Sequence, residues 1–250
     1  MVENHEIRRE NAGVTGKLYG IGVGPGDPEL LTLKAVRCIG ESDRLILPAA
    51  SKETCYAYQI AVTALPELAE KECICLEFPM IKEKEQLEKS HDEIYHKIRE
   101  YLLQGETVGF LTIGDPAVYS TFEYIRKRAV AEEFEAHVIN GVPSFCAAAA
   151  AAGRSLADSG EQIHILPASY EDGGEALPGT RIYMKSGRKL GTLKKQLLHE
   201  QKTGGKHYDI WAVSNCGMAN ERVFHGLSEL DENSGYLTIV IAKEMKAETV

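Results

Sequence analysis

The sequence lacks several features that define large classes of protein. No apolar run reaches the roughly 20 residues that a membrane-spanning helix needs, so we expect no transmembrane helix. The polar segment Met1–Gly16 has no apolar core of the kind found in secretory signal peptides. We therefore expect a cytoplasmic protein whose chain begins with a flexible tail.

An excess of positive charge is also absent. The chain has 28 Lys and Arg against 37 Asp and Glu, which gives a formal net charge of −9 at pH 7. Nonspecific binding to nucleic acid or to anionic lipid depends on basic patches. We expect neither nucleic acid nor a membrane as a partner. A small anionic ligand stays compatible, because one pocket can be basic on an acidic protein.

Metal-ligand spacing is missing as well. No C-x-x-C pair occurs, and no histidine has convincing ligand spacing, so we expect no protein-bound metal. Without a secretion signal the thiols are expected to be reduced, and to act as small apolar residues. The chain has six cysteines: Cys38, Cys55, Cys73, Cys75, Cys146 and Cys216.

The first half of the chain alternates apolar runs of strand length with amphipathic stretches. Lys17–Val23 is typical of a buried strand and Glu29–Ile39 of a helix, and Thr107–Thr112 and Val118–Val130 repeat this order. Alternation of this kind predicts a parallel sheet covered by helices. The other predicted elements are the strands Arg44–Leu47, Cys73–Phe78 and Ala136–Ile139 and the helix Glu85–Gln104.

The pattern changes after Gly141. A helix of small residues over Ser144–Ala152 precedes several strand-like segments and one strong helix, Leu190–Gln201. Many strands with few helices predict a mixed, partly antiparallel sheet. The predicted organisation is a tail (1–16), an N-terminal α/β domain (17–141), a C-terminal mixed α/β domain (142–244) and a second tail (245–250). The strand-like segments are Gln162–Leu166, Arg181–Lys185, Tyr208–Val213, Arg222–His225 and Tyr236–Ala242.

A glycine-rich segment, Gly20–Pro28 (GIGVGPGDP), follows the first strand. Its nearest familiar pattern is the dinucleotide fingerprint G-x-G-x-x-G, but its third glycine falls one residue early and Pro25 removes a backbone donor. The next strand also ends without the acidic residue of that fingerprint, which disfavours a nucleotide-dependent oxidoreductase. Two interpretations remain: a loop that cradles a ligand, or a tight turn that lets two elements pack closely.

Two later segments also follow strands. Leu111–Thr121 contains Gly114, which permits a sharp turn, and Pro116, which suits a first helical position. Asp115 reads either as a helix cap or as part of a ligand site, since ligands of open parallel sheets bind at the carboxyl edge. The segment Asn140–Phe145 lies at the predicted domain junction, where a ligand cleft or a linker turn with an N-cap is expected.

Taken in order, these segments resemble the tetrapyrrole methylase family, and the resemblance extends from Lys17 to about Lys243. Finer segments are similar to family members that methylate C-20 of precorrin-2 or cobalt-factor II. These segments are Gly114–Thr121, Ser144–Ala149, Met184–Arg188 and Asn215–Met218, together with Glu221.

The resemblance implies two α/β domains with a cleft between them, S-adenosylmethionine as methyl donor, a tetrapyrrole substrate and a homodimer. It implies that the cofactor is bound by Gly114, Asp115, Val118, Tyr119, Ser120, Thr121, Ser144, Phe145, Met184, Val213 (or Ala212), Tyr236, Leu237 and Thr238. It implies that the substrate trough is lined by Gly22, Gly24, Pro25, Gly26, Asp27 and Arg188.

The implied chemistry is an in-line displacement at the sulfonium methyl group. The reduced macrocycle is already nucleophilic at C-20, so the protein mainly holds the reactants together. Tyr119 and Asp115 are the candidate catalytic residues and Glu221 is a further candidate base; each also reads as a structural hydrogen-bonding residue. Candidate cations for the substrate carboxylates are Arg188, Lys185, Lys189, Arg154 and Arg222. A methylase acting at another ring position, one with a protein substrate, and a noncatalytic tetrapyrrole carrier remain as alternatives.

Overall fold

The computed structural model describes residues 16–79, 83–167, 177–203 and 207–245. The two predicted tails therefore lie outside the described residues, apart from Gly16 and Met245. The chain divides into a first compact unit that ends at Pro143 and a second that begins at Ser144.

The first unit is built on a five-stranded sheet with the strand order β3-β2-β4-β1-β5. Every pairing in it is parallel, which confirms the prediction from strand–helix alternation. Because β4, β1 and β5 are neighbours, the loops that follow them emerge at the same edge of the sheet. The strands are β1 (Lys17–Gly22), β2 (Arg44–Leu47), β3 (Cys73–Cys75), β4 (Thr107–Thr112) and β5 (Glu135–Ile139).

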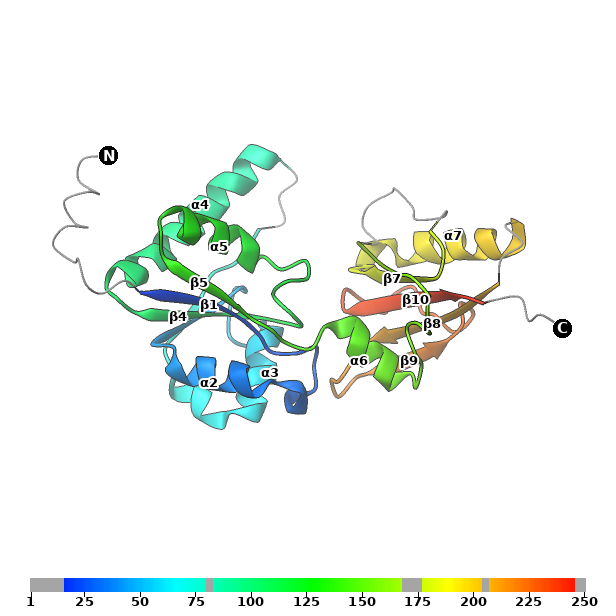
Figure 1. Cartoon of the computed structure of the whole chain (residues 1–250), viewed down its shortest axis with the longest axis horizontal. Coiled ribbons are helices and arrows are strands. Elements are labelled where there is room, and N and C mark those ends of the chain that lie inside the picture. The colour runs from blue at the N-terminus through cyan, green and yellow to red at the C-terminus, as the bar shows by residue number, and fades with distance from the viewer. Residues whose placement is uncertain (1–15, 80–82, 168–176, 204–206, 246–250) are drawn as a thin grey trace. The chain divides into compact units, whose positions relative to one another are not determined.

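Helices cover both faces of this sheet (Figure 1). The long helix α4 buries Ile94, Ile98 and Leu102, which recur at helical spacing and pack with residues of β1 and β4. Burying one such side chain stabilises the fold by about 1.5–3 kcal/mol. Helices α4 (Lys84–Leu103) and α5 (Phe122–Ala131) lie on one face, and α2 (Leu33–Glu41) and α3 (Tyr56–Ala64) lie on the other.

Two helices begin later than the sequence pattern indicates. Helix α2 begins at Leu33, because the Thr32 hydroxyl caps it by accepting a hydrogen bond from the Ala35 N–H at 3.1 Å. Helix α5 begins at Phe122, so the prediction that Val118 and Pro116 open this helix is wrong. Tyr119 has a φ of 50°, a left-handed conformation that a right-handed helix does not accommodate.

The second unit contains a mixed sheet with the strand order β6-β7-β10-β8-β9. Strands β6 and β7 are parallel, whereas β10 runs antiparallel to β7 and β8, and β9 runs antiparallel to β8. This arrangement confirms the predicted mixed sheet. The strands are β6 (Ile163–Pro167), β7 (Thr180–Met184), β8 (Tyr208–Ser214), β9 (Arg222–His225) and β10 (Thr238–Glu244).

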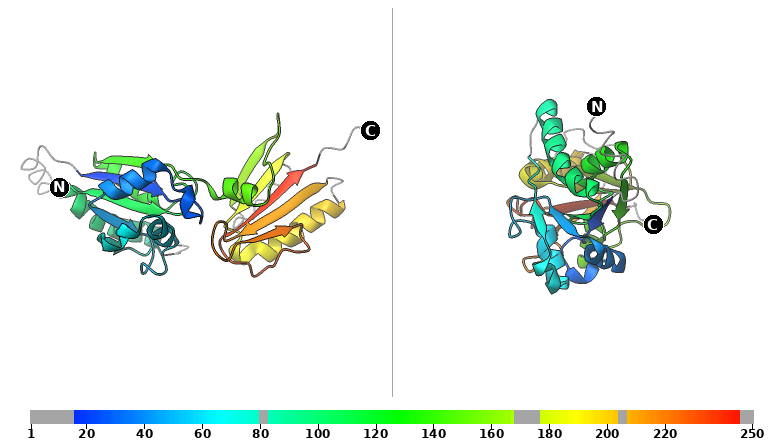
Figure 2. Two further views of the ribbon diagram at one scale, coloured as in Figure 1. Left: turned by 90° about the horizontal axis from the view of Figure 1, so that it is seen from below. Right: turned by 90° about the vertical axis from the view of Figure 1, so that its left-hand side faces the viewer.

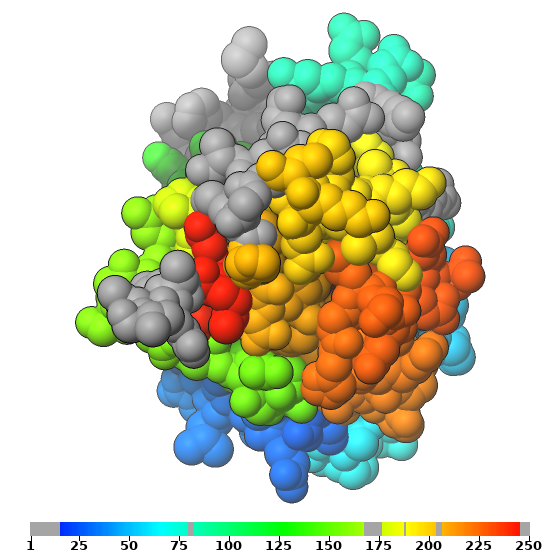
Figure 3. All heavy atoms as spheres, turned by 90° about the vertical axis from the view of Figure 1, so that its right-hand side faces the viewer, coloured from blue at the N-terminus to red at the C-terminus, as the bar shows by residue number. Residues whose placement is uncertain are grey.

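Helix α7 (Leu190–Thr203) and helix α6 (Ser144–Ala151) lie on opposite faces of this sheet (Figures 1 and 2). Helix α7 buries Leu190, Leu193 and Leu197 in a cluster with apolar residues of β7, β8 and β10. The segment after β9 packs beside α7, and the Lys194 ammonium group donates to the Leu230 carbonyl at 2.8 Å (Figure 3).

Candidate functional site

Two of the predicted loops are joined by their backbones at the carboxyl edge of the first sheet. The Gly114 N–H donates to the Gly24 carbonyl at 2.7 Å, and the Gly24 N–H donates to the Gly114 carbonyl at 3.3 Å. Gly24 has a φ of 76° and Gly114 a φ of 74°. Only glycine adopts such angles without strain, so this pairing depends on both glycines.

At the same edge, the backbone is packed so closely around two glycines that neither position has room for a side chain. A Cβ atom on Gly141 would lie 2.2 Å from the Gly114 carbonyl oxygen. A Cβ atom on Gly22 would lie 2.6 Å from that oxygen and 2.6 Å from the Gly141 nitrogen. Gly22, the last residue of β1, therefore lets the loops that follow β4 and β5 approach its backbone closely.

Asp115 ties the loop after β4 to the loop after β5. One carboxylate oxygen accepts from the Ala117 N–H at 2.7 Å, and the other accepts from the Asn140 amide and the Gly141 N–H, each at 3.1 Å. The side chain is buried, with 7% of its surface exposed. Three hydrogen bonds to one buried carboxylate make Asp115 a positioning residue in this structure, and its predicted catalytic role stays a prediction.

Thr32 adds a contact that sequence reasoning missed. Besides capping α2, its hydroxyl donates to the Asn140 carbonyl at 3.2 Å. A threonine before a helix signals an N-cap, but no local pattern shows that it also reaches a loop far along the chain.

The segment 118–121 presents partly exposed side chains at this edge. Tyr119 is 43% exposed, and Val118, Ser120 and Thr121 are half-buried. The Ser120 hydroxyl lies 3.1 Å from the Thr112 hydroxyl and accepts from the Phe122 N–H at 3.2 Å. The left-handed backbone of Tyr119 is strained for a residue with a side chain, and such strain often accompanies function.

The predicted substrate-trough residues differ in accessibility. Gly22, Gly24, Pro25 and Gly26 are buried, whereas Asp27 is half-buried and accepts a hydrogen bond from the Glu29 N–H at 2.9 Å. The side chain of Arg188 lies outside the described residues. Contact between these residues and a tetrapyrrole stays a prediction.

In the second unit, the predicted cofactor residues gather at one edge of the mixed sheet. Thr238 pairs with Ser214 and Val240 with Tyr183, so the start of β10 lies beside the ends of β7 and β8. This register brings together Met184, Val213 and Thr238. Met184 and Leu237 are half-buried and Tyr236 is 54% exposed, whereas Val213 and Thr238 are fully buried.

A hydroxyl chain, not foreseen from the sequence, supports this edge. The Thr238 hydroxyl donates to the Ser214 hydroxyl at 3.2 Å, and the latter donates to the Ser234 carbonyl at 2.8 Å. Both hydroxyl side chains are buried. Buried hydroxyl groups need hydrogen-bond partners of this kind. The hydrogen bonds from Thr238 and Ser214 therefore fix the turn that carries Tyr236 and Leu237.

Strained backbone is concentrated at these two edges. Among the described residues, four that are not glycine have a positive φ, and three of them follow strand ends: Tyr119, Lys185 and Asn215. Lys185 follows β7 and Asn215 follows β8. Burial lowers the pKa of the Lys185 ammonium group.

The remaining candidate residues are either partly exposed or already engaged in a hydrogen bond or an ion pair. Ser144 and Phe145 open α6 and are half-buried. The Glu221 carboxylate accepts from the Gly217 N–H at 2.6 Å, and Arg154 and Arg222 each form an ion pair at 3.3 Å, with Asp209 and Asp231 respectively.

Within residues 16–79, 83–167, 177–203 and 207–245, no three His, Cys, Asp or Glu side chains gather as metal ligands do. The expected absence of a protein-bound metal stays a prediction. In the same part of the chain, none of the helices has the length and apolar character needed to span a bilayer.

Comparison with known proteins supports the family resemblance over most of the chain. A family model described as Tetrapyrrole (Corrin/Porphyrin) Methylases matches residues 17–231. The probable cobalt-precorrin-2 C(20)-methyltransferase of Methanocaldococcus jannaschii is 32% identical over 237 residues, which are 92% of this chain and 97% of that protein. The precorrin-2 C(20)-methyltransferase of a Sinorhizobium species is 27% identical over 244 residues, 92% of this chain and 96% of that protein.

The fold has solved counterparts as well. The uroporphyrin-III C-methyl transferase of Thermus thermophilus, solved with S-adenyl homocysteine, superposes with a TM-score of 0.66 at 23% identity. The superposition covers 91% of this chain and 97% of that one. The match to the family model, the near full-length relatives and the shared fold agree, and the chain belongs to the tetrapyrrole methylase family.

Proposed function

We propose that the protein transfers the methyl group of S-adenosylmethionine to C-20 of precorrin-2 or of its cobalt-containing counterpart, cobalt-factor II, in cobalamin (vitamin B12) biosynthesis. The observation that carries the proposal is the near full-length similarity to two C(20)-methyltransferases, which this chain covers to 97% and 96% of their lengths.

The side chains at each of the two edges have the chemistry that parts of S-adenosylmethionine require, since this molecule combines a flat aromatic adenine, a ribose with hydroxyl groups and a charged amino-acid end. Tyr119, Ser120 and Thr121 offer hydroxyl groups, and Phe145, Met184 and Leu237 offer partly exposed apolar surface. The side chains of Asp115, Val213 and Thr238 are buried, so these residues, like Gly114, would contribute through their backbone groups. Such mixtures of apolar surface with a few placed polar groups are typical of small-molecule sites.

The methyl donor supplies a methyl group on a positively charged sulfur. The chain's own part is to hold this methyl group in line with the attacking ring carbon, which lowers the barrier by several kcal/mol (about 7–11 in favourable cases). The glycine contacts and the Asp115 carboxylate fix the loops that would do this. No protein nucleophile is required, because the reduced ring provides the attacking carbon.

We assign to Tyr119 a relay of the proton that leaves C-20: its hydroxyl oxygen would accept that proton while it passes its own proton to a solvent water molecule. Tyr119 is 43% exposed, and its backbone has a φ of 50°. General-base help of this kind is typically worth about 10²–10⁴-fold in rate. The Glu221 carboxylate is engaged with the Gly217 N–H and is a weaker candidate for this role.

We further propose that the protein works as a cytoplasmic homodimer without a bound metal. Sedimentation equilibrium is expected to give twice the mass of one chain, and elemental analysis of the purified protein is expected to find no stoichiometric metal. A monomer, or one metal ion for each chain, would contradict these two parts of the proposal.

The activity is tested with labelled S-adenosylmethionine and precorrin-2, with and without cobalt in the ring. The expected result is a product with one added methyl group in at least one of the two reactions. Calorimetry with S-adenosylhomocysteine is the companion measurement. Binding without any methylated product would contradict the proposed substrate, and the absence of binding would contradict a methyltransferase role altogether.

A further inference from the structure

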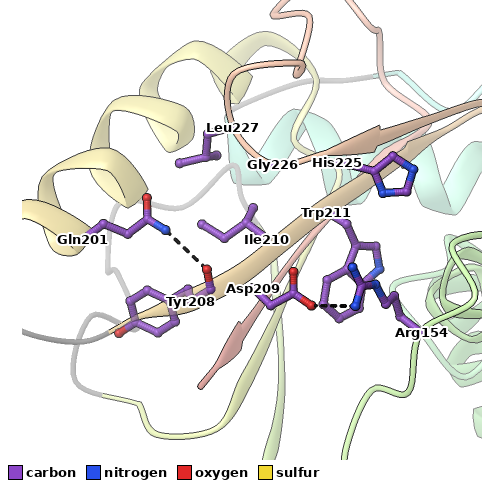
Figure 4. Close-up of a pocket in the computed structure, with 9 residues that line it drawn as sticks. All are labelled: Arg154, Gln201, Tyr208, Asp209, Ile210, Trp211, His225, Gly226 and Leu227. Atoms are coloured by element: carbon purple, nitrogen blue, oxygen red, sulfur yellow. Dashed lines mark hydrogen bonds and ion pairs between the residues drawn. The ribbon is translucent and has the colours of Figure 1, made fainter. Parts of the chain in front are cut away.

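A small pocket in the second unit is not used by the function proposed above, although one of its residues, Arg154, is among the candidate cations named from the sequence. It has a volume of about 290 Å³ and opens along the first half of β8 (Figure 4). None of its residues belongs to the predicted cofactor set, whose β8 member, Val213, lies near the other end of that strand. The residues that line it are Arg154, Gln201, Tyr208, Asp209, Ile210, Trp211, His225, Gly226 and Leu227.

Two opposite charges lie side by side at this pocket. The Arg154 guanidinium group is 3.3 Å from the Asp209 carboxylate, and their side chains are 48% and 31% exposed (Figure 4). An ion pair that solvent reaches this easily is weak, so either partner can exchange the other for a charged ligand. A planar guanidinium group matches a carboxylate, and a carboxylate matches an ammonium group.

The pocket also contains an unused hydrogen-bond donor. Trp211 is 1% exposed, and its indole N–H has no acceptor among the described residues. Buried N–H groups in folded proteins are normally satisfied by protein, water or a ligand. A ligand oxygen atom at this position would satisfy the indole.

The rest of the lining sets the size and character of the ligand. Ile210 and Leu227 are each 6% exposed and belong to the core under α7. Ile210 points to the opposite face of the sheet from Asp209 and Trp211. The Gln201 amide donates to the Tyr208 carbonyl at 3.3 Å. The Asp209 carboxylate disfavours a multiply charged anion such as phosphate. A volume near 290 Å³ admits a molecule about the size of a free amino acid.

We propose that this pocket binds a small zwitterion, in the manner of a free α-amino acid. The ligand carboxylate pairs with Arg154 and accepts from the Trp211 N–H, and the ligand ammonium group pairs with Asp209. The inference does not depend on the proposed methyl transfer, because it concerns binding alone.

Trp211 is the single tryptophan of the sequence, so its indole N–H reports ligand binding at this pocket. The indole N–H gives one resonance in a ¹H–¹⁵N spectrum of the full-length protein, and L-leucine is the ligand to titrate. We expect a saturable shift of that resonance. Isovalerate and isoamylamine, which each carry one of the two charges on a similar skeleton, are expected to bind at least ten-fold more weakly.

Matched variants locate the binding. Arg154→Met and Asp209→Asn are each expected to weaken leucine binding at least ten-fold. Arg222→Met breaks a second exposed ion pair of the same 3.3 Å length outside the pocket, and is expected to leave the titration unchanged. The dispersion of the backbone spectrum shows whether each variant is folded.

Three results would overturn the proposal. The first is an indole resonance that does not move up to the solubility limit of leucine. The second is a shift with isovalerate or isoamylamine alone that equals the shift with leucine. The third is leucine binding by the Arg154→Met or Asp209→Asn protein that is as tight as binding by the native protein. In the first case, an indole contact to water alone would account for the buried donor.

Discussion

The carboxylate of Asp115 accepts a hydrogen bond from the Gly141 N–H at 3.1 Å, and this contact joins two loops that the chain separates by one helix and one strand. The Gly114 carbonyl oxygen lies against the same glycine. The carboxyl edge of the first sheet is therefore a fixed structure, set by one buried carboxylate and a few glycines.

Replacing Asp115 with asparagine tests this positioning. Asn keeps the shape but turns one acceptor into a donor that faces the N–H groups of Asn140 and Gly141. We expect the free energy of unfolding to fall by about 1–3 kcal/mol and the methyl-transfer rate to fall with it. Glu77→Gln, at an exposed position in the same unit, is the control and should leave chemical denaturation unchanged. Equal midpoints for the two variants would show that Asp115 does not fix the loops.

The glycine packing gives a matched pair of substitutions. Gly141→Ala forces a Cβ to within 2.2 Å of a carbonyl oxygen, and we expect a loss of about 1–3 kcal/mol of stability. Gly40 lies inside helix α2 and a Cβ atom there would meet nothing within 4 Å, so Gly40→Ala is expected to stabilise by about 0.5–1 kcal/mol. Thermal unfolding of the two proteins should move in opposite directions. A stable Gly141→Ala protein would contradict the packing described here.

Tyr119 is tested by removing only its hydroxyl group. For Tyr119→Phe we expect kcat to fall by about 10²-fold or more. Binding of S-adenosylhomocysteine is expected to weaken by about ten-fold at most, because only one hydroxyl contact is lost. Tyr124→Phe, a change at an exposed tyrosine in the helix that follows, is the control. If kcat is unchanged in Tyr119→Phe, the residue only shapes the site and the proton leaves by another route.

The sequence predicted the sheets better than the contacts at their edges. The order of strands and helices was enough for a parallel first sheet, since periodicity is a local property. The hydrogen bonds of Asp115 were not foreseeable, because they depend on the strand order, which places β4 and β5 on either side of β1. Helix α3 was missed for a different reason: its apolar residues, among them Ala57, Tyr58, Ile60 and Ala61, leave little amphipathic period to recognise.

The start of α5 shows where local signals mislead. Gly114, Asp115 and Pro116 have the composition of a helix start, yet the helix begins only at Phe122. The left-handed turn at Tyr119 keeps the preceding residues out of the helix, and nothing in the residue type of a tyrosine indicates such a turn. The segment that departs most from its local pattern is the one that offers hydroxyl groups at the candidate site.

His91 gives the fold a dependence on pH. Its ring is buried and stacks on Tyr124, with centroids 4.3 Å apart and an interplanar angle of 17°. Burial, with a smaller contribution from the Arg128 charge, lowers the pKa of His91 in the folded protein. The unfolded chain therefore binds the proton more readily, and stability present above the unfolded pKa of about 6.5 is lost as the pH falls towards the folded pKa.

This loss is measurable by denaturation over a range of pH. Each pKa unit by which the folded and unfolded values differ corresponds to about 1.4 kcal/mol of the free energy of unfolding. The His91→Phe protein keeps a stacked ring but has no titrating group there, so its free energy of unfolding should vary less with pH in this range. His199→Gln, at an exposed histidine of α7, should retain the pH dependence of the native protein. Identical profiles for the native and His91→Phe proteins would exclude His91 as the source.

The position of the new methyl group on the ring decides whether the protein is a C-20 methyltransferase. The protein is incubated with precorrin-2, or with its cobalt-containing counterpart, and S-adenosylmethionine that carries a ¹³C-labelled methyl group, and the product is examined by NMR. We expect one labelled methyl group, attached to C-20. A labelled methyl group at any other ring position, or no labelled tetrapyrrole from either substrate, would contradict it.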